Sequence, residues 1–412
     1  MKLLFLLPSV PTPPDAGAKM RNLGLLRLAA QDHEVDAIAF GPPAAIDGLA
    51  PLVRRGAVVP PPPTRHPVRR ALDVARSSLP DMAQRLWSTQ FLESLHRFLA
   101  TERYDAVQAE AIEMARYLRA LRPRAPEDSG PCRVYDAHNP EFLLQRRAFD
   151  TALARGGVRG AAAAAYSFVQ WRRLERFERG AVRASRLALA VSYHDANQLE
   201  ALAPGSARVH VVPNGIDVQR YPFRLPDPGD APNLLFLGKL DYRPNVEALG
   251  WLVTEVLPRL FARLPKARLF VVGDSPPVWL VAAGQRDDRI AVTGPVPDER
   301  PYLARAAALV LPMRVGGGSR VKALVALASG VPIVSTLVGM EGLEAEMSAH
   351  YLCADTADEW TQALAHLLGD TGLRRRLARS GRVLVERRYD WSAIAPSLRE
   401  AYAALEDGAR PR

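Results

Sequence analysis

Short apolar runs alternate with amphipathic stretches along the whole chain. Strands buried on both faces of a parallel sheet read as nearly continuous apolar runs, and helices between them show a longer period. The pattern therefore predicts α/β layering on parallel sheets. The predicted strands of the first half are 2–7, 34–40, 106–109, 133–137, 187–191 and 209–212. Those of the second half are 233–237, 268–272, 290–292, 308–311 and 332–335.

A proline-rich segment separates the two series of strands. Residues 221–232, YPFRLPDPGDAP, hold four prolines and a glycine, a composition typical of a linker. A chain of 412 residues is also long for one ordinary domain. We expect a doubly wound domain over 1–220, a second over 221–386, and a cleft between them. Residues 387–412 hold one more amphipathic helix after the second domain is complete.

One long helix in the first half allows two interpretations. Residues 157–185 are rich in alanine and arginine and carry Tyr166, Trp171 and Phe177. A basic helix with an aromatic side can lie on an anionic membrane surface. The alternative is a solvated connecting helix that packs its aromatic side on the domain.

Charge and cysteine usage narrow the function classes. The chain carries 54 Lys and Arg against 44 Asp and Glu, a net charge of +10, which suits phosphate-bearing ligands, nucleic acid or an anionic membrane. We expect no nucleic-acid partner, because the interleaved basic and aromatic residues of a single-strand binder are absent. Cys132 and Cys353 match no metal spacing and favour a reducing compartment.

The apolar runs are also too short for a membrane span of ~20 residues. The N-terminal run, 3–7, is shorter than the ~7–15 residues of a signal-peptide core. We therefore expect a cytoplasmic protein that can contact the inner face of the membrane.

A glycine loop after the strand 308–311 predicts an anion site. Gly316 to Gly318 and Ser319 precede an apolar helix pattern, and this construction directs backbone N–H groups and the helix dipole at an anion. Arg320 and Lys322 add two cations there. The Walker and dinucleotide patterns are both absent. A plain tight turn is the alternative, but three glycines followed by Ser-Arg-x-Lys favour phosphate binding through Gly317, Gly318 and Ser319.

Ligands of doubly wound sheets bind at the carboxyl ends of strands, which selects two further places. Gly238 and Lys239 end the first strand of the second domain, where Lys239 is either a diphosphate ligand or a solvated loop lysine. His138 follows a first-domain strand in VYDAHNPE. A lone histidine is more often structural, but the polar neighbours Asp136, Asn139 and Glu141 favour a functional role.

The order of motifs resembles glycosyltransferase family 4. In the first half the matching stretches are PPDAGAKMRNLGLLRLAAQDHEV, DAVQAEAIEMARYL, LAVSYHDANQL and VHVVPNGIDVQRY; in the second they are FLGKLDYRPNVEALGWLVTEVLPRL, VTGPVPDERPYLARAAALVLPMRVGGGSRVKALVALASGVPIVST and YDWSAI. The resemblance implies the GT-B fold of two Rossmann-like domains, with the last helix crossing back onto the first. It is strongest to bacterial sugar transferases of exopolysaccharide and other surface-glycan pathways.

The resemblance also implies roles for residues. The donor would be a UDP- or GDP-linked sugar and the acceptor a glycan or a lipid-linked molecule, with retention of anomeric configuration and no metal or cofactor. His138 would contact the donor sugar, and Val296, in TGPVPD, would meet the nucleobase. The diphosphate would bind Lys239, Arg320, Lys322 and the glycine loop, while Gly17 and Arg21 in the first loop and helix would contact substrate.

One position departs from the family pattern. The usual signature is Glu, seven residues, Glu; its first position falls at Gly317, a known variation, and its second at Val325. That second glutamate ordinarily hydrogen-bonds the ribose of the nucleotide, so the hold on the nucleoside is weakened. This position favours one alternative to an active transferase, a non-catalytic GT-B scaffold or regulatory partner. A sugar-nucleotide epimerase or another enzyme on the same fold is a third hypothesis, which the absence of a second carboxylate or histidine cluster facing the loop disfavours.

Overall fold

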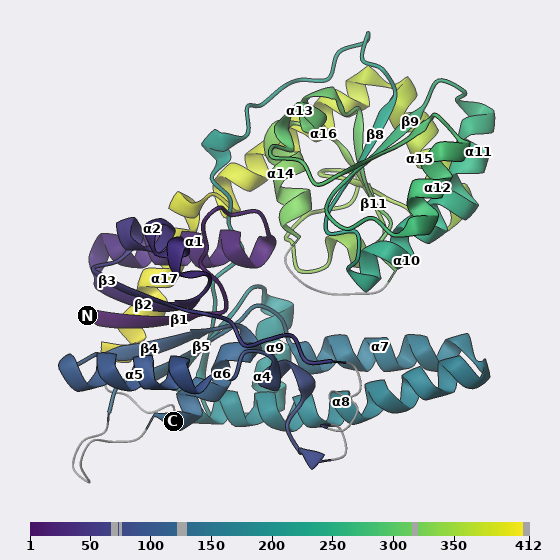
Figure 1. The fold of residues 1–412 in the computed structure, drawn as a ribbon. Helices are drawn as coiled ribbons and strands as arrows, with labels where there is room; N and C mark the ends of the chain where they lie inside the picture. The colour runs from purple at the N-terminus through teal and green to yellow at the C-terminus, as the bar shows by residue number, and fades with distance from the viewer. Residues whose placement is uncertain (67–72, 74–75, 122–129, 315–319, 407–412) are drawn as a thin grey trace. The chain divides into compact units, whose positions relative to one another are not determined.

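The computed structural model describes residues 1–66, 73, 76–121, 130–314 and 320–406. It divides into two compact units (Figure 1): unit 1 is Met1–Asn214 together with the chain from Ile394 onward, and unit 2 is Gly215–Ala393. The divisions fall near, but not at, the expected 220/221 and 386/387. The reason is that Ile216 forms a parallel bridge with Asp390 and its backbone N–H donates to the Tyr389 carbonyl over 2.9 Å. This bridge ties the residues after Asn214 to unit 2.

Unit 1 holds a seven-stranded parallel sheet of order β3-β2-β1-β4-β5-β6-β7. The chain enters at β1, winds outward through β2 and β3, and returns to the other side of β1 with β4. Leu3 of β1 is consequently paired with Val35 of β2 on one side and with Ala106 of β4 on the other. The strands are β1 Lys2–Leu7, β2 Glu34–Phe40, β3 Arg55–Val59, β4 Ala106–Glu110, β5 Cys132–Ala137, β6 Leu187–Ala190 and β7 Arg208–Val211.

Unit 2 repeats this winding in a six-stranded parallel sheet of order β10-β9-β8-β11-β12-β13. The strands are β8 Asn233–Leu237, β9 Arg268–Val272, β10 Ile290–Gly294, β11 Ala308–Leu311, β12 Ile333–Ser335 and β13 Leu352–Cys353. In both sheets the strand order reverses beside the first strand, between β1 and β4 and between β8 and β11. Such reversal points, at the carboxyl ends of the strands, are where doubly wound sheets bind ligands.

The predicted α/β class and parallel sheets are confirmed, and every predicted strand is present. Two strands were not predicted, and both lack the buried run that identifies a strand. β3 is a half-buried edge strand of sequence RGAVV, and β13 has only two residues. An edge strand buries less apolar surface, so its sequence carries a weaker signal.

Helices surround both sheets. Those of unit 1 are α1 Gly17–Asp32, α2 Ile46–Leu49, α4 Asp81–Arg85, α5 Thr89–Thr101, α6 Ala111–Ala120, α7 Glu141–Arg155, α8 Gly157–Ala184, α9 Tyr193–Leu202 and α17 Trp391–Glu406. Those of unit 2 are α10 Arg243–Trp251, α11 Leu257–Arg263, α12 Val278–Arg286, α13 Arg300–Arg305, α14 Val321–Ser329, α15 Ala357–Gly369 and α16 Thr371–Arg388, with a π-helical turn Leu252–Val256 between α10 and α11.

The last helix, α17, belongs to the core of unit 1. Ile394, Leu398 and Tyr402, at helical spacing, are each at most 2% exposed. Leu398 and Tyr402 meet Leu28 and Ala29 of α1 around a small cavity. A helix that follows unit 2 in sequence is therefore packed as an internal part of unit 1.

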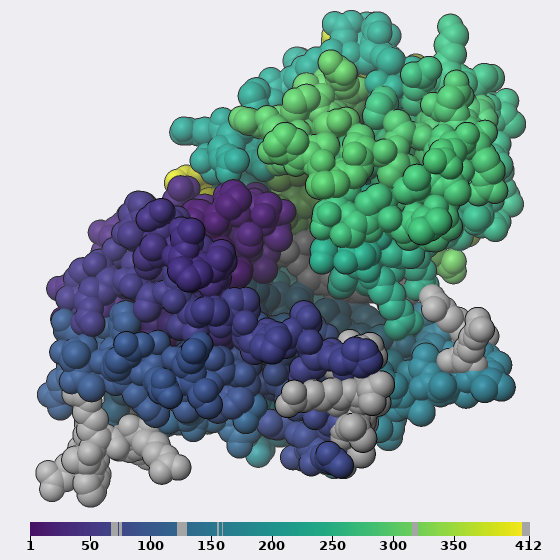
Figure 2. Space-filling view, in the orientation of Figure 1, coloured from purple at the N-terminus to yellow at the C-terminus, as the bar shows by residue number. Residues whose placement is uncertain are grey.

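Helices α7 and α8 form an antiparallel hairpin that extends past the sheet of unit 1 (Figure 1), and part of it is visible as blue atoms at the lower right of Figure 2. Phe177 of α8 is buried in the core, as a packed connecting helix requires. Tyr166 and Phe168 are 39% and 45% exposed. The buried Phe177 fits the packed connecting helix, whereas contact of the exposed part with a membrane stays a prediction. In the described part of the chain, no helix is both long and apolar enough to span a membrane.

Candidate functional site

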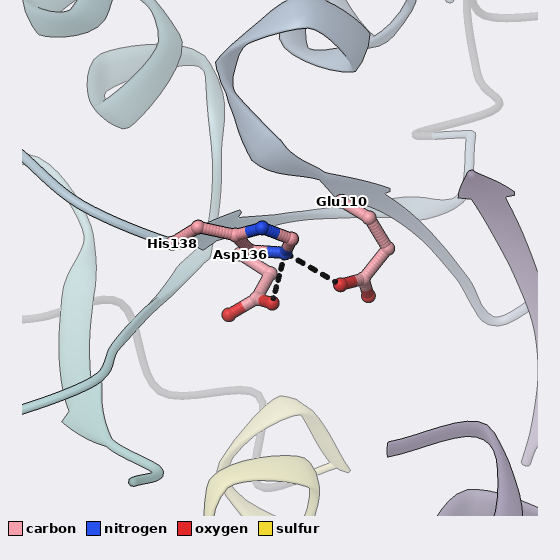
Figure 3. A group of neighbouring side chains, drawn as sticks. All are labelled: Glu110, Asp136 and His138. Carbon is pink, nitrogen blue, oxygen red and sulfur yellow. Dashed lines mark hydrogen bonds and ion pairs between the residues drawn. The ribbon is translucent and has the colours of Figure 1, made fainter. Parts of the chain in front are cut away.

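Three ionisable side chains meet at the reversal point of unit 1 (Figure 3). Glu110 is the last residue of β4, Asp136 lies in the adjacent β5, and His138 follows β5. The His138 Nε2 atom lies 3.3 Å from Glu110 Oε2 and 3.2 Å from Asp136 Oδ2. Both carboxylates are fully buried, and the His138 side chain is 12% exposed. The Glu110–Asp136 register of the two strands brings these side chains together.

Burial and mutual charge shift the titration of this group. Burial alone would lower the pKa of His138, but hydrogen bonds to Asp136 and Glu110 raise it to about 9. Burial, followed by the negative charge of Asp136, raises the pKa of Glu110 to about 7. Asp136 is held ionised, because the Arg21 guanidinium keeps its pKa well below the usual range despite burial. His138 is therefore a cation at neutral pH and can donate hydrogen bonds, but it cannot act as a base.

Arg21 orients the Asp136 carboxylate of this group. Its Nε and Nη2 atoms donate to the two oxygens of Asp136 over 2.7 and 2.5 Å, and Nη1 donates to the carbonyls of Val212 and Pro213. The side chain is 1% exposed. The prediction that Arg21 contacts substrate is therefore wrong: its donors are directed at the protein, and it orients Asp136 instead. Gly17 is the first residue of the same helix.

The group does not fit a metal ion, although the ligand atoms of Glu110, Asp136 and His138 lie within 4.8 Å of one another. Both oxygens of Asp136 already accept hydrogen bonds from Arg21. A divalent cation there would lie beside this guanidinium, and metal ligation would require His138 to be neutral. The two carboxylates are therefore suited to hold the His138 side chain as an imidazolium ion, and the three residues together are not suited to bind a metal.

A second group lies at the reversal point of unit 2. The Lys322 Nζ atom, in the first turn of α14, donates to Asn245 Oδ1 over 2.8 Å, and lies 4.9 Å from the centre of the Phe236 ring. Asn245 Nδ2 in turn donates to the Lys239 carbonyl over 2.7 Å. Gly238, which has a φ of 147°, lies against both Asn245 and Lys322. A Cβ atom on it would lie 2.9 Å from Asn245 Nδ2 and 3.2 Å from Lys322 Nζ. Another residue would be strained at this φ and would displace these two side-chain ends.

Lys322 is the most strongly perturbed cation of unit 2 among the described residues. Burial, and then the positive charge of Arg320, lower its pKa to about 7. Arg320 is 7% exposed and donates from Nη2 to the Val338 carbonyl over 2.6 Å. A buried ammonium next to a helix start and a second cation is a place where an anion would lower the electrostatic energy.

The other predicted residues are more scattered. Lys239 is 63% exposed and forms an ion pair with Asp241 at 3.3 Å, so its side chain is not part of the Lys322 group. Val296 lies half-buried in the loop after β10, and Val325 is 5% exposed in α14. Gly317, Gly318 and Ser319 lie outside the described residues.

Two residues of these groups were not singled out from the sequence. Glu110 is an acidic residue at the end of an apolar strand, and this is the same signal that selected His138. Asn245 had no such signal, because it lies inside a helix, 77 residues from Lys322. Its role becomes visible only when the amide is seen between Lys239 and Lys322.

Two doubly wound parallel sheets, each with polar and charged groups at its reversal point, define the GT-B class of two-domain α/β proteins. Solved structures of that class share the fold. The chain is similar to sucrose-phosphate synthase from Thermosynechococcus elongatus, with a TM-score of 0.73 at 18% identity over 99% of this chain and 100% of that one.

Two family models match the chain, "Glycosyltransferase Family 4" over residues 25–220 and "Glycosyl transferases group 1" over residues 231–370. Between them they cover most of the sequence, and the chain belongs to glycosyltransferase family 4. Two relatives from Mycobacterium tuberculosis are glycogen synthase, 32% identical over 51% of this chain and 52% of the relative, and phosphatidyl-myo-inositol mannosyltransferase, 31% identical over 50% and 56%. The chain thus spans about half the length of the curated relatives it matches.

Proposed function

We propose that this protein transfers a hexose from a UDP- or GDP-linked donor to a lipid-linked or polysaccharide acceptor of a surface-glycan pathway. The bond between the anomeric carbon and the diphosphate oxygen breaks, and the oxygen of an acceptor hydroxyl bonds to the same face of that carbon, so the configuration is retained. The proton of that hydroxyl passes to the departing diphosphate oxygen, and the nucleoside diphosphate leaves. No metal or cofactor takes part, because cations neutralise the leaving diphosphate. Family membership supports the reaction class, and one observation supports the site: the buried Lys322 ammonium beside Asn245 and Gly238.

The two units supply different contacts in this proposal. In unit 2, Lys322, Arg320 and the N–H groups at the start of α14 stabilise the charge that develops on the diphosphate. Lys239, exposed at the end of β8, is free to turn toward the same phosphates by giving up its solvent-exposed pair with Asp241. In unit 1, the His138 imidazolium donates a hydrogen bond to a hydroxyl group of the sugar.

Release of nucleoside diphosphate from a panel of UDP- and GDP-sugars tests the proposal. Lys322→Met should reduce turnover by about 10²-fold, the effect of losing one preorganised stabiliser of charge. Arg320→Ala should have an effect of similar size. Lys266→Met is the matched control, because Lys266 is an exposed lysine of the same unit. Full activity in the Lys322 and Arg320 variants would place the diphosphate elsewhere.

A non-catalytic scaffold remains the alternative function, and Val325 at the position of the ribose-binding glutamate favours it. The same assay separates the two. A folded wild-type protein that binds no nucleotide and releases no diphosphate from any donor would contradict the transferase and support the scaffold.

We also propose how the protein reaches a lipid-linked acceptor. A lipid-linked acceptor lies in a membrane, and the exposed side of α8 offers a basic and aromatic surface. Phe168, Arg172 and Arg176 are spaced by four residues and are all exposed. We propose that this stripe contacts an anionic bilayer at the cytoplasmic face. Co-sedimentation with vesicles of anionic and of neutral lipid tests it: Arg172→Glu with Arg176→Glu should abolish binding to anionic vesicles, and binding unchanged in that variant would exclude the stripe.

A further inference from the structure

The Glu110 carboxylate divides its two oxygen atoms between two partners. Oε2 lies 3.3 Å from His138 Nε2, whereas Oε1 accepts a hydrogen bond from Gln108 Nε2 over 2.7 Å. Gln108 and Glu110 are two residues apart on β4, so their side chains leave the same face of the sheet. Both are at most 2% exposed. The Asn22 amide nitrogen, in the orientation that satisfies both ends of that amide, also donates to Oε2 over 3.0 Å. The Gln108 amide therefore fixes the rotation of the carboxylate from the Oε1 side.

The orientation of the Gln108 amide is itself fixed from the opposite direction. Its Oε1 atom accepts a hydrogen bond from the Tyr402 hydroxyl over 2.8 Å. Tyr402 lies in α17, 294 residues later in the chain, and is 2% exposed. A hydroxyl that donates to one end of an amide leaves the NH₂ end to point the other way, toward Glu110. Tyr402, Gln108, Glu110 and His138 thus form one continuous hydrogen-bonded chain.

The backbone after Glu110 is also constrained. Ala111 has a φ of 67°, a left-handed conformation that a residue with a Cβ adopts at a cost of about 1–3 kcal/mol. This residue joins the end of β4 directly to α6. The sharp turn keeps Glu110 at the end of its strand, where it faces His138, instead of letting the strand continue.

We propose that Tyr402, Gln108 and Glu110 are positioning residues that together orient the His138 imidazole. Helix α17 then contributes to the candidate site, beyond its contribution to the core of unit 1. The effect on turnover rests on the proposed sugar transfer, whereas the orientation of the ring does not.

The titration of His138 provides a readout that does not depend on activity. The ionisable groups that interact with the ring are Glu110 of β4 and Asp136 of β5, which contact it, and Glu113 of α6 and Glu141 of α7, which act through their charge; Arg21 of α1 acts on it through Asp136. Of these, in the described part of the chain, only Glu110 accepts a side-chain hydrogen bond from Gln108, which in turn accepts one from Tyr402. Loss of the Tyr402 hydroxyl should therefore act on His138 through Glu110.

The experiment is NMR of the full-length protein with isotope-labelled histidine, in which a His138→Asn variant assigns the signal. Glu110→Gln should lower the titration midpoint of His138 by at least about one unit, since a neighbouring charge is removed. Tyr402→Phe should lower it by about 0.3–1 unit, corresponding to one weakened hydrogen bond. Tyr104→Phe is the matched control: it removes another buried hydroxyl of unit 1, one that donates to Asp36 of β2 instead of to the Gln108–Glu110 pair. It should leave the midpoint unchanged.

Turnover measured on the same variants separates the inference from the proposed function. Tyr402→Phe should lower kcat by about 3- to 10-fold, the value of one hydrogen bond, with nucleotide affinity unchanged. An unchanged His138 midpoint in Tyr402→Phe would overturn the inference, whatever the activity. A shifted midpoint in Tyr402→Phe, found together with a wild-type protein that transfers no sugar, would support the positioning and contradict the proposed function.

Discussion

The Lys322 ammonium donates to Asn245 Oδ1 over 2.8 Å, and the other end of that amide donates to the backbone carbonyl of Lys239. Because both ends of the amide are used, Asn245 cannot rotate away, and the position of the ammonium is fixed. Among the described residues, no carboxylate forms an ion pair with Lys322, and burial lowers its pKa to about 7. A bound diphosphate would supply the missing negative charge.

Diphosphate binding should therefore be coupled to the uptake of a proton. With a pKa of about 7, Lys322 should be largely neutral at pH 8 in the ligand-free protein, and an anion next to it favours the charged form. Calorimetry of UDP or GDP binding at pH 8, in two buffers of different ionisation enthalpy, should give an uptake approaching one proton. Lys322→Met should abolish the uptake and Lys266→Met should preserve it. The same uptake in both variants would assign the proton to another group.

His138 should make stability depend on pH between about 6.5 and 9. Its pKa is raised from 6.5 to about 9 on folding, so the stabilisation is complete below pH 6.5 and is lost as the pH rises through 9. The unfolding free energy of the wild type should fall relative to His138→Asn by about 3 kcal/mol over this range. Denaturant unfolding at several pH values measures it. Parallel pH profiles for the two proteins would show that His138 is not held as a cation.

Val325→Glu tests whether position 325 corresponds to the ribose-binding glutamate of the family signature. Val325 is 5% exposed, and every residue of α14 from Ala323 to Ser329 is buried, so an unpaired charge there should lower stability by about 1–3 kcal/mol or more. Val325→Gln is the control with the same shape and no charge. If the position faces a ribose, the glutamate variant should bind nucleotide about 10-fold more tightly than the glutamine variant. Equal affinities would mean that this position does not contact the nucleoside.

Helix α17 should be essential for the stability of unit 1. Leu398→Ala removes a side chain that is 2% exposed and should cost about 2–5 kcal/mol. Glu400→Ala, two residues later, changes a side chain that is 78% exposed and should stay within about 0.5 kcal/mol of the wild type. The two melting temperatures give the comparison. If both variants melt as the wild type does, the helix is not packed as described.

The sequence by itself determined the two sheets, most of their strands and the loops that carry chemistry. Runs such as Lys2–Leu7 and Asn233–Leu237 are apolar because the strands they form are buried on both faces of a sheet. The position of His138 and Gly238 at strand ends followed from the same runs. These are local properties, and a pattern of a few neighbouring residues is enough to carry them.

Only the tertiary structure decided which of those residues act together. Parallel pairing places the carboxyl ends of β4 and β5 side by side, and so joins Glu110 to Asp136 and His138. The contacts of Arg21 with Asp136, of Lys322 with Asn245 and of Tyr402 with Gln108 each span far more residues than a local pattern covers. Arg21 shows the consequence: the family resemblance implied a substrate contact, yet the fold buries the side chain against Asp136. Side-chain contacts depend on which strands become neighbours, and strand order is a property of the whole sheet.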